Sequence, residues 1–273
     1  IAAKRVMAMM RAGENVQPLF SSMLRCVRTN DIQLKKLAYL YLVNYSSQEP
    51  EQAIMCVGTF VQDIQDTNPF VRALAVRTMC RIRLDSVAEH LIQPLRSCLK
   101  DKDPYVRKTA AIGVAKLYGI IPESVENAQL FDNLLELLKD DNPLVVTNAT
   151  SAIFEINERR ITPIFEMTGE TIGPILNALS TSTEWCQITL LDCLSRYKPI
   201  CVDDANFLID RLIPLLKNAN PALIVGAFKC IFLMMDSSDK NLNEIFPMIL
   251  PPFITLASSA APEVQFVVLR TLS

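Results

Sequence analysis

Side chains that could perform chemistry are few in this sequence. His90 is the single histidine among 273 residues, and the eight cysteines form no Cys-x-x-Cys pair. Metal centres and general-base mechanisms draw most often on histidine, and structural zinc sites need cysteines at short regular spacing. The sequence therefore predicts no metal ligand, no cofactor site and no catalytic residue, with His90 in a structural or surface role.

The cysteines lie in apolar contexts of helical character, such as Met79-Cys80 and Cys230-Ile231. Buried free thiols in a reducing compartment are the interpretation that this favours over disulfides. The segment Gly169–Gly173 resembles a short glycine loop, but it follows no predicted strand and contains no lysine. A phosphate cradle needs a strand before the loop and a helix after it. The chain is therefore not predicted to be an enzyme.

The overall charge and hydrophobicity of the sequence exclude further classes of protein. Lys and Arg number 27 against 29 Asp and Glu, which gives a net charge of −2, and half of the residues are hydrophobic. A chain with net negative charge has no overall positive potential that would attract a nucleic acid. Its high apolar content excludes an intrinsically disordered chain. The longest apolar stretches are broken by Lys229 or by prolines, so no segment is predicted to span a membrane.

The elements that must position any functional residue are given by internal repetition. The segments DTNPFVRALAV, DKDPYVRKTAA and DDNPLVVTNAT, which begin at Asp66, Asp101 and Asp140, are alike, and four further segments keep the same frame. We call the residue at the place of the shared proline the mark of each repeat. The marks are Ile32, Pro69, Pro104, Pro143, Glu184, Pro221 and Pro262, spaced 35 to 41 residues apart. This spacing is typical of paired helices of the HEAT or armadillo kind.

Each mark predicts the start of a helix. Asn68, Asp103, Asn142 and Asn220 are good N-caps, and the proline after each of them suits the first helical position. A second helix is predicted before each mark, over Glu14–Val27, Glu51–Ile64, Ser86–Leu99, Ala128–Lys139, Thr171–Leu179, Asp203–Leu216 and Leu242–Ala257. Pro94, Pro174 and Pro252 lie within three of these ranges and are predicted to kink the helices.

The predicted fold class is all-α, a right-handed α-solenoid (superhelix) of about seven HEAT or armadillo-type helix pairs that forms one array over residues 1–273. No alternating strand pattern is present. Complete solenoids end in polar caps, whereas helical patterns run to both ends of this sequence. We therefore expect a fragment that is truncated at both ends within a longer array.

Basic residues recur at fixed places in the repeats. Arg72 and Arg107 follow the valine of their segments, and Lys35 occupies the equivalent place in the first repeat. We predict a ladder in which each cation meets an aspartate of an adjacent turn, such as Asp66 or Asp101, with a ligand site as the alternative.

Other charged and aromatic residues are less specific. Lys4, Arg5, Lys35 and Lys36 make the beginning of the chain locally basic, which indicates either a solvated face or a contact with an anionic lipid headgroup. Arg77, Arg81 and Arg83 are interpreted as a solvated face. Trp185 is expected to pack.

Five blocks carry a resemblance beyond the repeat. The blocks are Asn30–Tyr45, Glu51–Asp63, Asn68–Arg83, Leu99–Tyr118 and Thr183–Tyr197. Together they resemble the trunk of a beta-adaptin, a large subunit of the heterotetrameric clathrin adaptor complexes, of the trans-Golgi or plasma-membrane type. Runs such as RALAVRTM are specific, because a repeat consensus does not supply the letters between the fixed positions. The resemblance covers about Ala3 to Leu272.

The resemblance implies a scaffolding subunit in vesicle-mediated intracellular protein transport. It implies a second large adaptin and the medium and small adaptor subunits as partners, and no nucleic acid. It also implies a cytoplasmic protein that is peripheral on the cytosolic face of trans-Golgi, endosomal or plasma membranes and on coated vesicles. Clathrin would be bound only through carboxy-terminal regions that this sequence lacks.

The resemblance also assigns sites. The positions that match a phosphoinositide contact are Lys4 and Arg5, with Lys35 and Lys36 beside them in the same basic group. Ile54 and Val57 match a contact with an Arf-type GTPase, although a spacing of three residues on an amphipathic helix is equally typical of core packing. Two other families remain as alternatives: a HEAT scaffold of another system, such as nuclear transport, and a beta-type coatomer subunit. The five matching blocks favour the clathrin adaptor.

Overall fold

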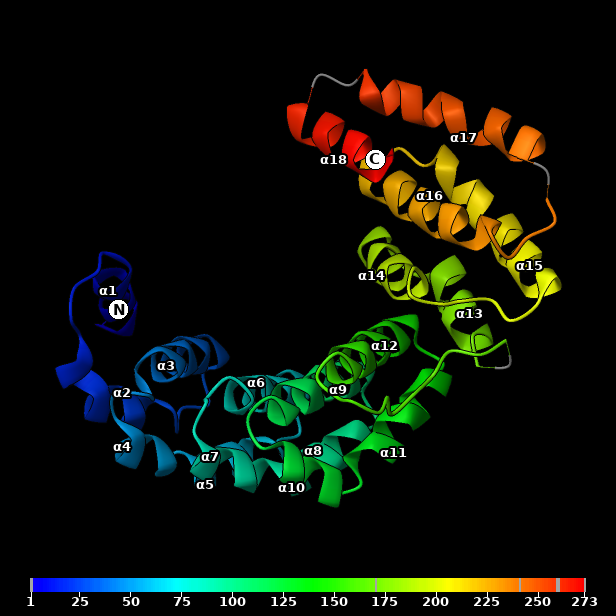
Figure 1. Ribbon diagram of the computed structural model, residues 1–273. Coiled ribbons are helices and arrows are strands. Elements are labelled where there is room, and N and C mark those ends of the chain that lie inside the picture. The colour runs from blue at the N-terminus through cyan, green and yellow to red at the C-terminus, as the bar shows by residue number, and fades with distance from the viewer. Residues whose placement is uncertain (1, 170, 241, 259–260, 273) are drawn as a thin grey trace. The chain divides into compact units, whose positions relative to one another are not determined.

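The computed structural model describes residues 2–169, 171–240, 242–258 and 261–272, without the side chains of 242–244 and 272. Within these ranges every regular element is a helix, as Figure 1 shows. No helix in the described ranges is long and apolar enough to cross a bilayer.

Every predicted mark is the first residue of a helix. We call these the motif helices: α3 (Ile32–Tyr45), α6 (Pro69–Met79), α9 (Pro104–Tyr118), α12 (Pro143–Asn157), α14 (Glu184–Leu194), α16 (Pro221–Met235) and α18 (Pro262–Leu272). The starts of the motif helices that the repeats predict therefore agree with the structure to the residue.

The helices that precede the marks are also present, but most are broken into shorter pieces. They are α1 (Ala2–Arg11), η1 (Gln17–Leu19), α2 (Phe20–Cys26), α4 (Pro50–Ile54), α5 (Val57–Asp63), α7 (Asp85–Ala88), η2 (Glu89–Leu91), α8 (Ile92–Leu99), α10 (Pro122–Asn127), α11 (Leu130–Glu136), η3 (Leu137–Lys139), α13 (Gly173–Thr181), α15 (Val202–Leu212), η4 (Ile213–Lys217) and α17 (Leu242–Ala257). Helix α10 was not predicted.

The loop before a motif helix explains why the helix starts where it does. The Asn68 carboxamide oxygen accepts a hydrogen bond from the Phe70 N–H at 2.9 Å, and the Asp66 carboxylate accepts one from the Asn68 N–H at 2.7 Å. The first bond caps the helix and the second turns the chain into it. The same pair of bonds recurs at Asp101/Asp103, Asp140/Asn142 and Asn218/Asn220. The proline at the mark has no N–H, so it leaves no donor unsatisfied.

The predicted proline kink is wrong for Pro174, which lies in the first turn of α13. A proline in the first turn removes no intrahelical hydrogen bond, so Pro174 starts this helix instead of bending it. Pro94 follows the 3-10 segment η2, which interrupts the helical run from Asp85 to Leu99 directly before it. Only Pro252 lies inside a helix, in α17, together with Pro247 and Pro251.

The chain divides into two compact units, which are described separately. One comprises residues up to Leu137 with Glu155–Ile164, and the other comprises Leu138–Phe154 with the residues from Phe165. In the first unit α3, α6 and α9 pack in succession, with α5 against α6 and α8 against α9. In the second, α14, α16 and α18 pack in the same way, with α13 and α15 on their neighbours. Within each unit these motif helices thus cover one another in succession, which is the packing of an all-α solenoid.

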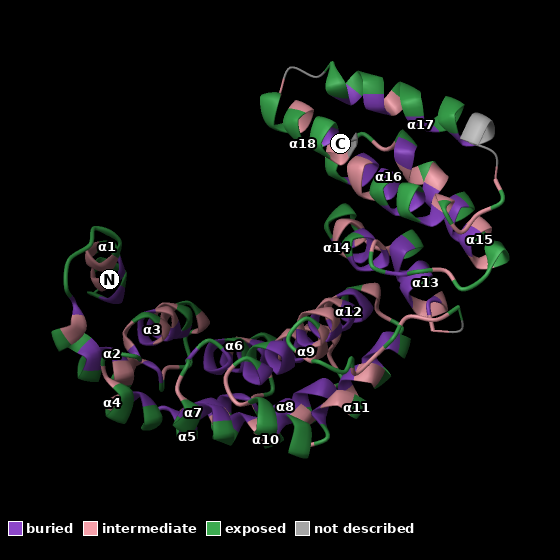
Figure 2. Cartoon of the chain, viewed as in Figure 1, coloured by how far each residue is buried: buried purple, intermediate pink, exposed green. Residues whose placement is uncertain are grey.

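The core of each unit lies between these helices (Figure 2). Fully buried side chains include Phe60, Leu95 and Leu117 in the first unit and Leu190 and Leu212 in the second. Gly113 in α9 marks a close helix contact: a Cβ built there would lie 2.9 Å from both the Cys80 Sγ and the Leu95 Cδ2. A side chain at this position would have to push apart two buried neighbours.

Candidate functional site

Lys35 forms a buried ion pair instead of lying on the surface. Its ammonium donates to both carboxylate oxygens of Asp63, at 2.7 and 2.6 Å, and the Tyr39 hydroxyl also donates to Asp63. Burial, together with the hydrogen bond to Asp63, raises the pKa of Tyr39, so this phenol stays protonated. Lys35 therefore joins α3 to the end of α5, and its charge is already balanced.

Arg72 repeats this arrangement one repeat later. Its guanidinium binds the two carboxylate oxygens of Asp101 at 2.8 and 2.7 Å, and Nη1 donates to the carbonyls of Asp66 and Thr67. Arg107 donates to the carbonyls of Asp101 and Lys102 in the same way. The predicted ladder of cations and aspartates is thus confirmed for Lys35, which meets Asp63, and for Arg72, which meets Asp101.

The ion pair sets the protonation of Asp101. Burial on its own raises the pKa of this carboxyl group, but hydrogen bonds from the Arg72 guanidinium and the Asp103 N–H outweigh burial and lower it. The hydrogen bond to Asp101 likewise raises the pKa of Arg72. Both groups are charged at neutral pH, and the pair is structural.

The remaining members of the predicted basic group are exposed. Lys4 and Arg5 lie on α1 and Lys36 lies on α3, and no hydrogen bond or ion pair is found for their side chains in the described part of the chain. Helix α1 packs against α3, and Asn44 near the end of α3 contacts the Met10 sulfur near the end of α1 at 3.6 Å. The beginnings of the two helices therefore lie on the same side. Lys35 does not belong to this exposed group, because its ammonium is taken by Asp63.

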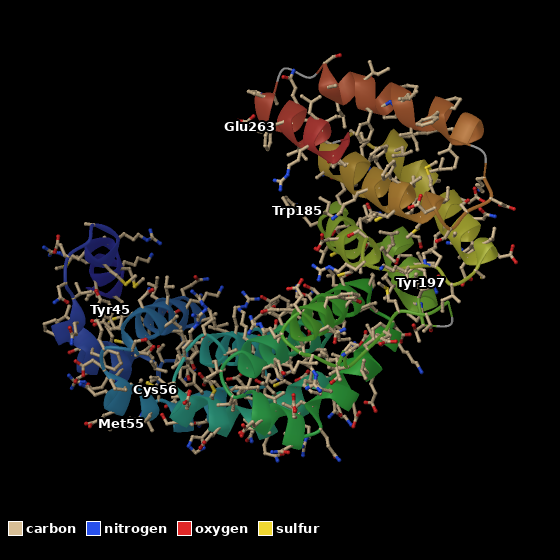
Figure 3. The ribbon with its side chains drawn as sticks, viewed as in Figure 1. Tyr45, Met55, Cys56, Trp185, Tyr197 and Glu263 are labelled. Atoms are coloured by element: carbon tan, nitrogen blue, oxygen red, sulfur yellow. The ribbon has the colours of Figure 1, made fainter. Side chains whose placement is uncertain are left out.

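The two residues matched to a GTPase contact lie in different environments. Ile54 ends α4 and is exposed, whereas Val57 begins α5 and is buried. The predicted single helix breaks at Met55 and Cys56, so the spacing of three residues does not place Ile54 and Val57 on one face. Met55, which was not selected from the sequence, is 71% exposed, and Figure 3 shows it pointing away from the unit. The exposed apolar pair at this turn is therefore Ile54 and Met55.

Trp185 does not pack as expected. It stands in the first turn of α14 and is 82% exposed (Figure 3). His90, in η2, is exposed as well, in agreement with a surface role. In the described residues no group of three or more His, Cys, Asp or Glu side chains could hold a metal ion.

The eight cysteines are free thiols. Most are buried, and burial raises the pKa of Cys56, Cys80, Cys98 and Cys230 to about 12. A thiol with such a pKa is almost wholly protonated at neutral pH and is a poor nucleophile. These cysteines are packing residues, as their apolar sequence contexts predicted.

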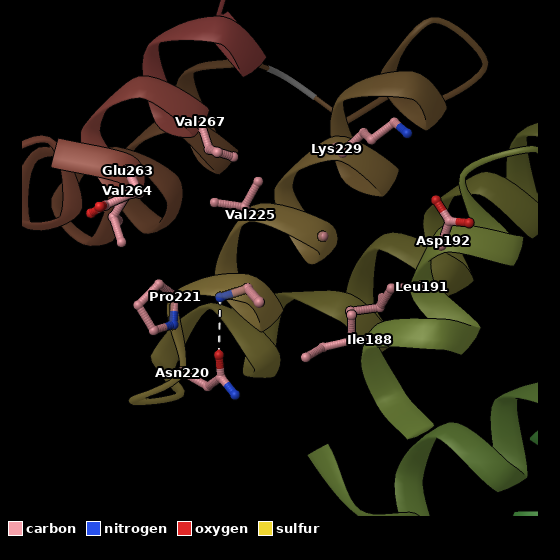
Figure 4. Close-up of a pocket in the computed structure, with 12 residues that line it drawn as sticks. Ile188, Leu191, Asp192, Asn220, Pro221, Val225, Lys229, Glu263, Val264 and Val267 are labelled. Atoms are coloured by element: carbon pink, nitrogen blue, oxygen red, sulfur yellow. Dashed lines mark hydrogen bonds between the residues drawn. The ribbon is translucent and has the colours of Figure 1, made fainter. Parts of the chain in front are cut away.

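An apolar groove lies in the second unit among α14, α16 and α18 (Figure 4). Its volume is about 500 Å³, and Ile188, Leu191, Val225, Val264 and Val267 line it, with Asp192, Lys229 and Glu263 among the polar residues. The Asn220 carboxamide at its edge is occupied in capping α16 through the Ala222 N–H. The groove offers apolar contact area and no arrangement of groups for chemistry.

A second cavity, in the first unit, has the opposite character. Its volume is about 560 Å³, and its lining contains Arg81, Arg83, Lys116, Glu155 and Arg159. From the sequence, Arg81 and Arg83 were assigned to a solvated face, and Lys116 and Arg159 were not selected. A signal was present, since Arg81, Lys116 and Glu155 each stand twelve residues after a mark.

Comparison with known proteins places this architecture in a family. Residues 2–273 match the family model described as "Adaptin N terminal region". The chain belongs to the adaptin family. The match covers both units and all seven motif helices, so the repeat frame is that of the adaptin amino-terminal region.

This adaptin chain has close relatives among proteins named as beta subunits. It is 44% identical over 276 aligned positions to the AP-1 complex subunit beta-1 of Homo sapiens, which covers 100% of this chain and 29% of the relative. It is 43% identical over 274 positions to the AP-1 complex subunit beta of Dictyostelium discoideum, with the same coverage of 100% and 29%. The chain thus spans less than a third of the length of these relatives.

A known structure shares the fold of this adaptin. It is described as "Homology model of the full-length AP-3 complex in an intermediate open conformation", and it matches with a TM-score of 0.66 at 18% identity, over 98% of this chain and 46% of that one. At this identity the likeness concerns the fold alone, and it agrees with the α-solenoid class.

Proposed function

We propose that this chain is the trunk portion of a beta-type adaptin that acts as a scaffold, not as an enzyme, in vesicle-mediated intracellular protein transport. The observation that carries the proposal is the identity of 44% over the whole chain to a protein named AP-1 complex subunit beta-1. The architecture supports it, because stacked helix pairs offer long surfaces for other subunits and need no reaction centre.

The partners that follow from this role are a second large adaptin and the medium and small subunits of one adaptor complex. The complex would select cargo on the cytosolic face of trans-Golgi, endosomal or plasma membranes. Clathrin contact is left to regions outside this chain, since the relatives are more than three times as long.

An anionic membrane surface is a further proposed partner. Lys4, Arg5 and Lys36 are exposed, carry no counter-charge in the described part of the chain, and lie at the beginnings of two packed helices. Basic residues near an anionic leaflet each contribute about 1 kcal/mol of attraction, so several such sites on one complex add up to attachment.

The Arf-type GTPase contact is proposed for Ile54 together with Met55. Val57 is left out because its side chain is buried. Changing Ile54 and Met55 to Asp would place two charges where the GTPase needs apolar contact, and we expect capture of the GTP-loaded GTPase to be lost. The control is Ile161→Asp, which places one charge at an exposed isoleucine in a loop of the same unit. Equal capture by both variants would exclude this site.

The experiment that tests the scaffold role is affinity purification of the full-length protein from its own cells, with the bound chains identified by mass spectrometry. Recovery of a second large adaptin with one medium and one small subunit is the expected result. Recovery of coatomer chains or nuclear-transport factors in their place would overturn the proposal.

A further inference from the structure

The basic cavity of the first unit collects positive charge in a chain that is acidic overall. Four cations line it, namely Arg81, Arg83, Lys116 and Arg159, against the single carboxylate of Glu155. The net charge of the whole chain is −2, so this excess is local. Such a concentration of like charge is unfavourable unless something offsets it.

Most of these cations are not balanced from within the protein. Arg159 donates to Glu155 at 2.9 Å and so accounts for the one carboxylate. For the side chains of Arg81, Arg83 and Lys116, no hydrogen bond or ion pair is found in the described part of the chain. This sets them apart from Lys35 and Arg72, which are fully engaged.

The repeat register explains how the cations come together. Arg81 follows α6, Lys116 lies in the last turn of α9, and Arg159 follows α12. Helices α6 and α9 pack side by side, and Arg81 and Lys116 each stand twelve residues after their marks, at equivalent positions of successive repeats. Arg83 and Arg159 stand fourteen and sixteen residues after theirs, so they add charge from other positions of the repeat. Gly119 completes the arrangement, because a Cβ there would lie 2.0 Å from the Arg159 Nη1. The glycine leaves the space that this guanidinium occupies.

The ends of the helices explain why the cations are tolerated, but not what they bind. The carboxyl end of a helix carries partial negative charge and favours nearby cations. That effect requires no common cavity, whereas these side chains line a single space of about 560 Å³. The volume is typical of a small-molecule site.

We propose that this cavity binds a compact polyanion that carries two or more phosphate groups. Guanidinium groups bind phosphate oxygens in a bidentate manner, and ammonium groups bind them as point charges. Arg81 and Arg83 can therefore each bind two oxygens of a phosphate group, and Lys116 can bind one. The cations line one cavity of about 560 Å³, which favours a compact anion over an extended acidic peptide. The site does not include Lys4, Arg5 or Lys36 and does not depend on the proposed membrane contact.

The test is calorimetric titration of the purified protein with inorganic tripolyphosphate. The double variant Arg81→Glu with Lys116→Glu reverses two of the free cations, and we expect it to lower the affinity about tenfold or more. The matched control, Lys198→Glu with Lys217→Glu, makes the same change in net charge at two exposed lysines of the other unit and is expected to bind as the unmodified protein does. Circular dichroism establishes that each variant is folded.

The outcomes are distinct. The proposal is overturned if the unmodified protein does not bind tripolyphosphate or if all three proteins bind it with equal affinity. It is also overturned if a phosphopeptide displaces tripolyphosphate and binds the cavity more tightly than tripolyphosphate does. Two further titrations identify the source of the phosphates. If the Arg81→Glu, Lys116→Glu variant loses binding of soluble inositol 1,4,5-trisphosphate and the unmodified protein does not bind vesicles, the ligand is a free metabolite. If the unmodified protein also binds vesicles that contain phosphatidylinositol 4,5-bisphosphate and the variant does not, the ligand is a lipid headgroup.

Discussion

The Arg72 guanidinium and the Asp101 carboxylate face each other through two parallel hydrogen bonds, from Nε to Oδ2 at 2.8 Å and from Nη2 to Oδ1 at 2.7 Å. Asp101 belongs to the loop that starts the next motif helix, where the same Oδ1 also accepts the Asp103 N–H. One carboxylate therefore joins two repeats and shapes the turn that leads into α9. Loss of the cation would disturb both roles.

The first prediction concerns this pair. The Asp101 side chain is only 13% exposed beside Arg72, and Arg72→Ala removes its counter-charge, so we expect the free energy of unfolding to fall by about 3–5 kcal/mol. Urea denaturation followed by circular dichroism measures the change. Arg83→Ala removes an exposed arginine and serves as control, with an effect of about 0.5 kcal/mol or less. Equal effects of the two changes would contradict the structural role of Arg72.

The second prediction follows from the lowered pKa of Asp101. A carboxyl group whose pKa is lower in the folded state binds protons more readily in the unfolded chain, so its contribution to stability is present above the unfolded pKa and is lost as the pH falls through the folded pKa. The difference in unfolding free energy between the unmodified protein and Asp101→Asn is therefore largest at neutral pH and shrinks below about pH 4. Denaturation curves at several pH values give this difference, and a value that stays constant on acidification would refute the prediction.

The third prediction concerns the thiols. Cys201 is exposed, whereas Cys56, Cys80, Cys98 and Cys230 are buried with pKa values raised to about 12. Iodoacetamide at pH 8 is expected to modify Cys201 first, with the four buried thiols protected until denaturant is added. Peptide mass spectrometry reads the modified positions. Rapid labelling of Cys98 in the native protein would count against the packing described.

The fourth prediction concerns the close contact at Gly113. Gly113→Ala places a Cβ at 2.9 Å from Cys80 and Leu95, and we expect a loss of about 1–3 kcal/mol from overpacking. Gly58→Ala, in α5, meets nothing within 4 Å and is expected to be neutral or to stabilise by up to about 1 kcal/mol through helix propensity. Thermal denaturation of the two variants tests the opposite signs.

The fifth prediction concerns the proposed membrane contact. Charge reversal of Lys4, Arg5 and Lys36 to Glu is expected to weaken binding to anionic liposomes and to flatten its dependence on salt. Reversal of Lys198, Lys217 and Lys229, which are exposed in the other unit, is the matched control. Liposome co-sedimentation over a range of salt concentrations measures both effects, and identical curves for the two variants would remove the contact.

The sequence was sufficient for the helix starts because their cause is local. Asp66, Asn68 and Pro69 make their own turn, cap and first helical residue within four positions, so nothing distant has to be known. The broken helices were harder. The turn at Met55 and Cys56 and the short helix α10 depend on how neighbouring helices pack, and apolar spacing does not reveal it. Pro122 followed by Glu123 was the available signal for α10.

The sites were predicted less well than the fold. Lys35 was assigned both to the ladder and to the lipid contact, and only its distance from Asp63 decides between them. Val57 is apolar, as an interface residue would be, but core positions use the same apolar side chains. The residue type alone therefore does not distinguish a buried position from a binding surface. The basic cavity joins residues from three repeats, and its cations converge only once α6, α9 and the end of α12 are placed in space.

The two ion pairs of the ladder span only 28 and 29 residues of sequence, from Lys35 to Asp63 and from Arg72 to Asp101. During synthesis the aspartate follows its cation after fewer residues than one repeat contains. Each pair can therefore close while later repeats are still to be made, and short loops of this kind favour rapid folding. The ladder therefore allows the repeats to fold one after another, in the order in which they leave the ribosome.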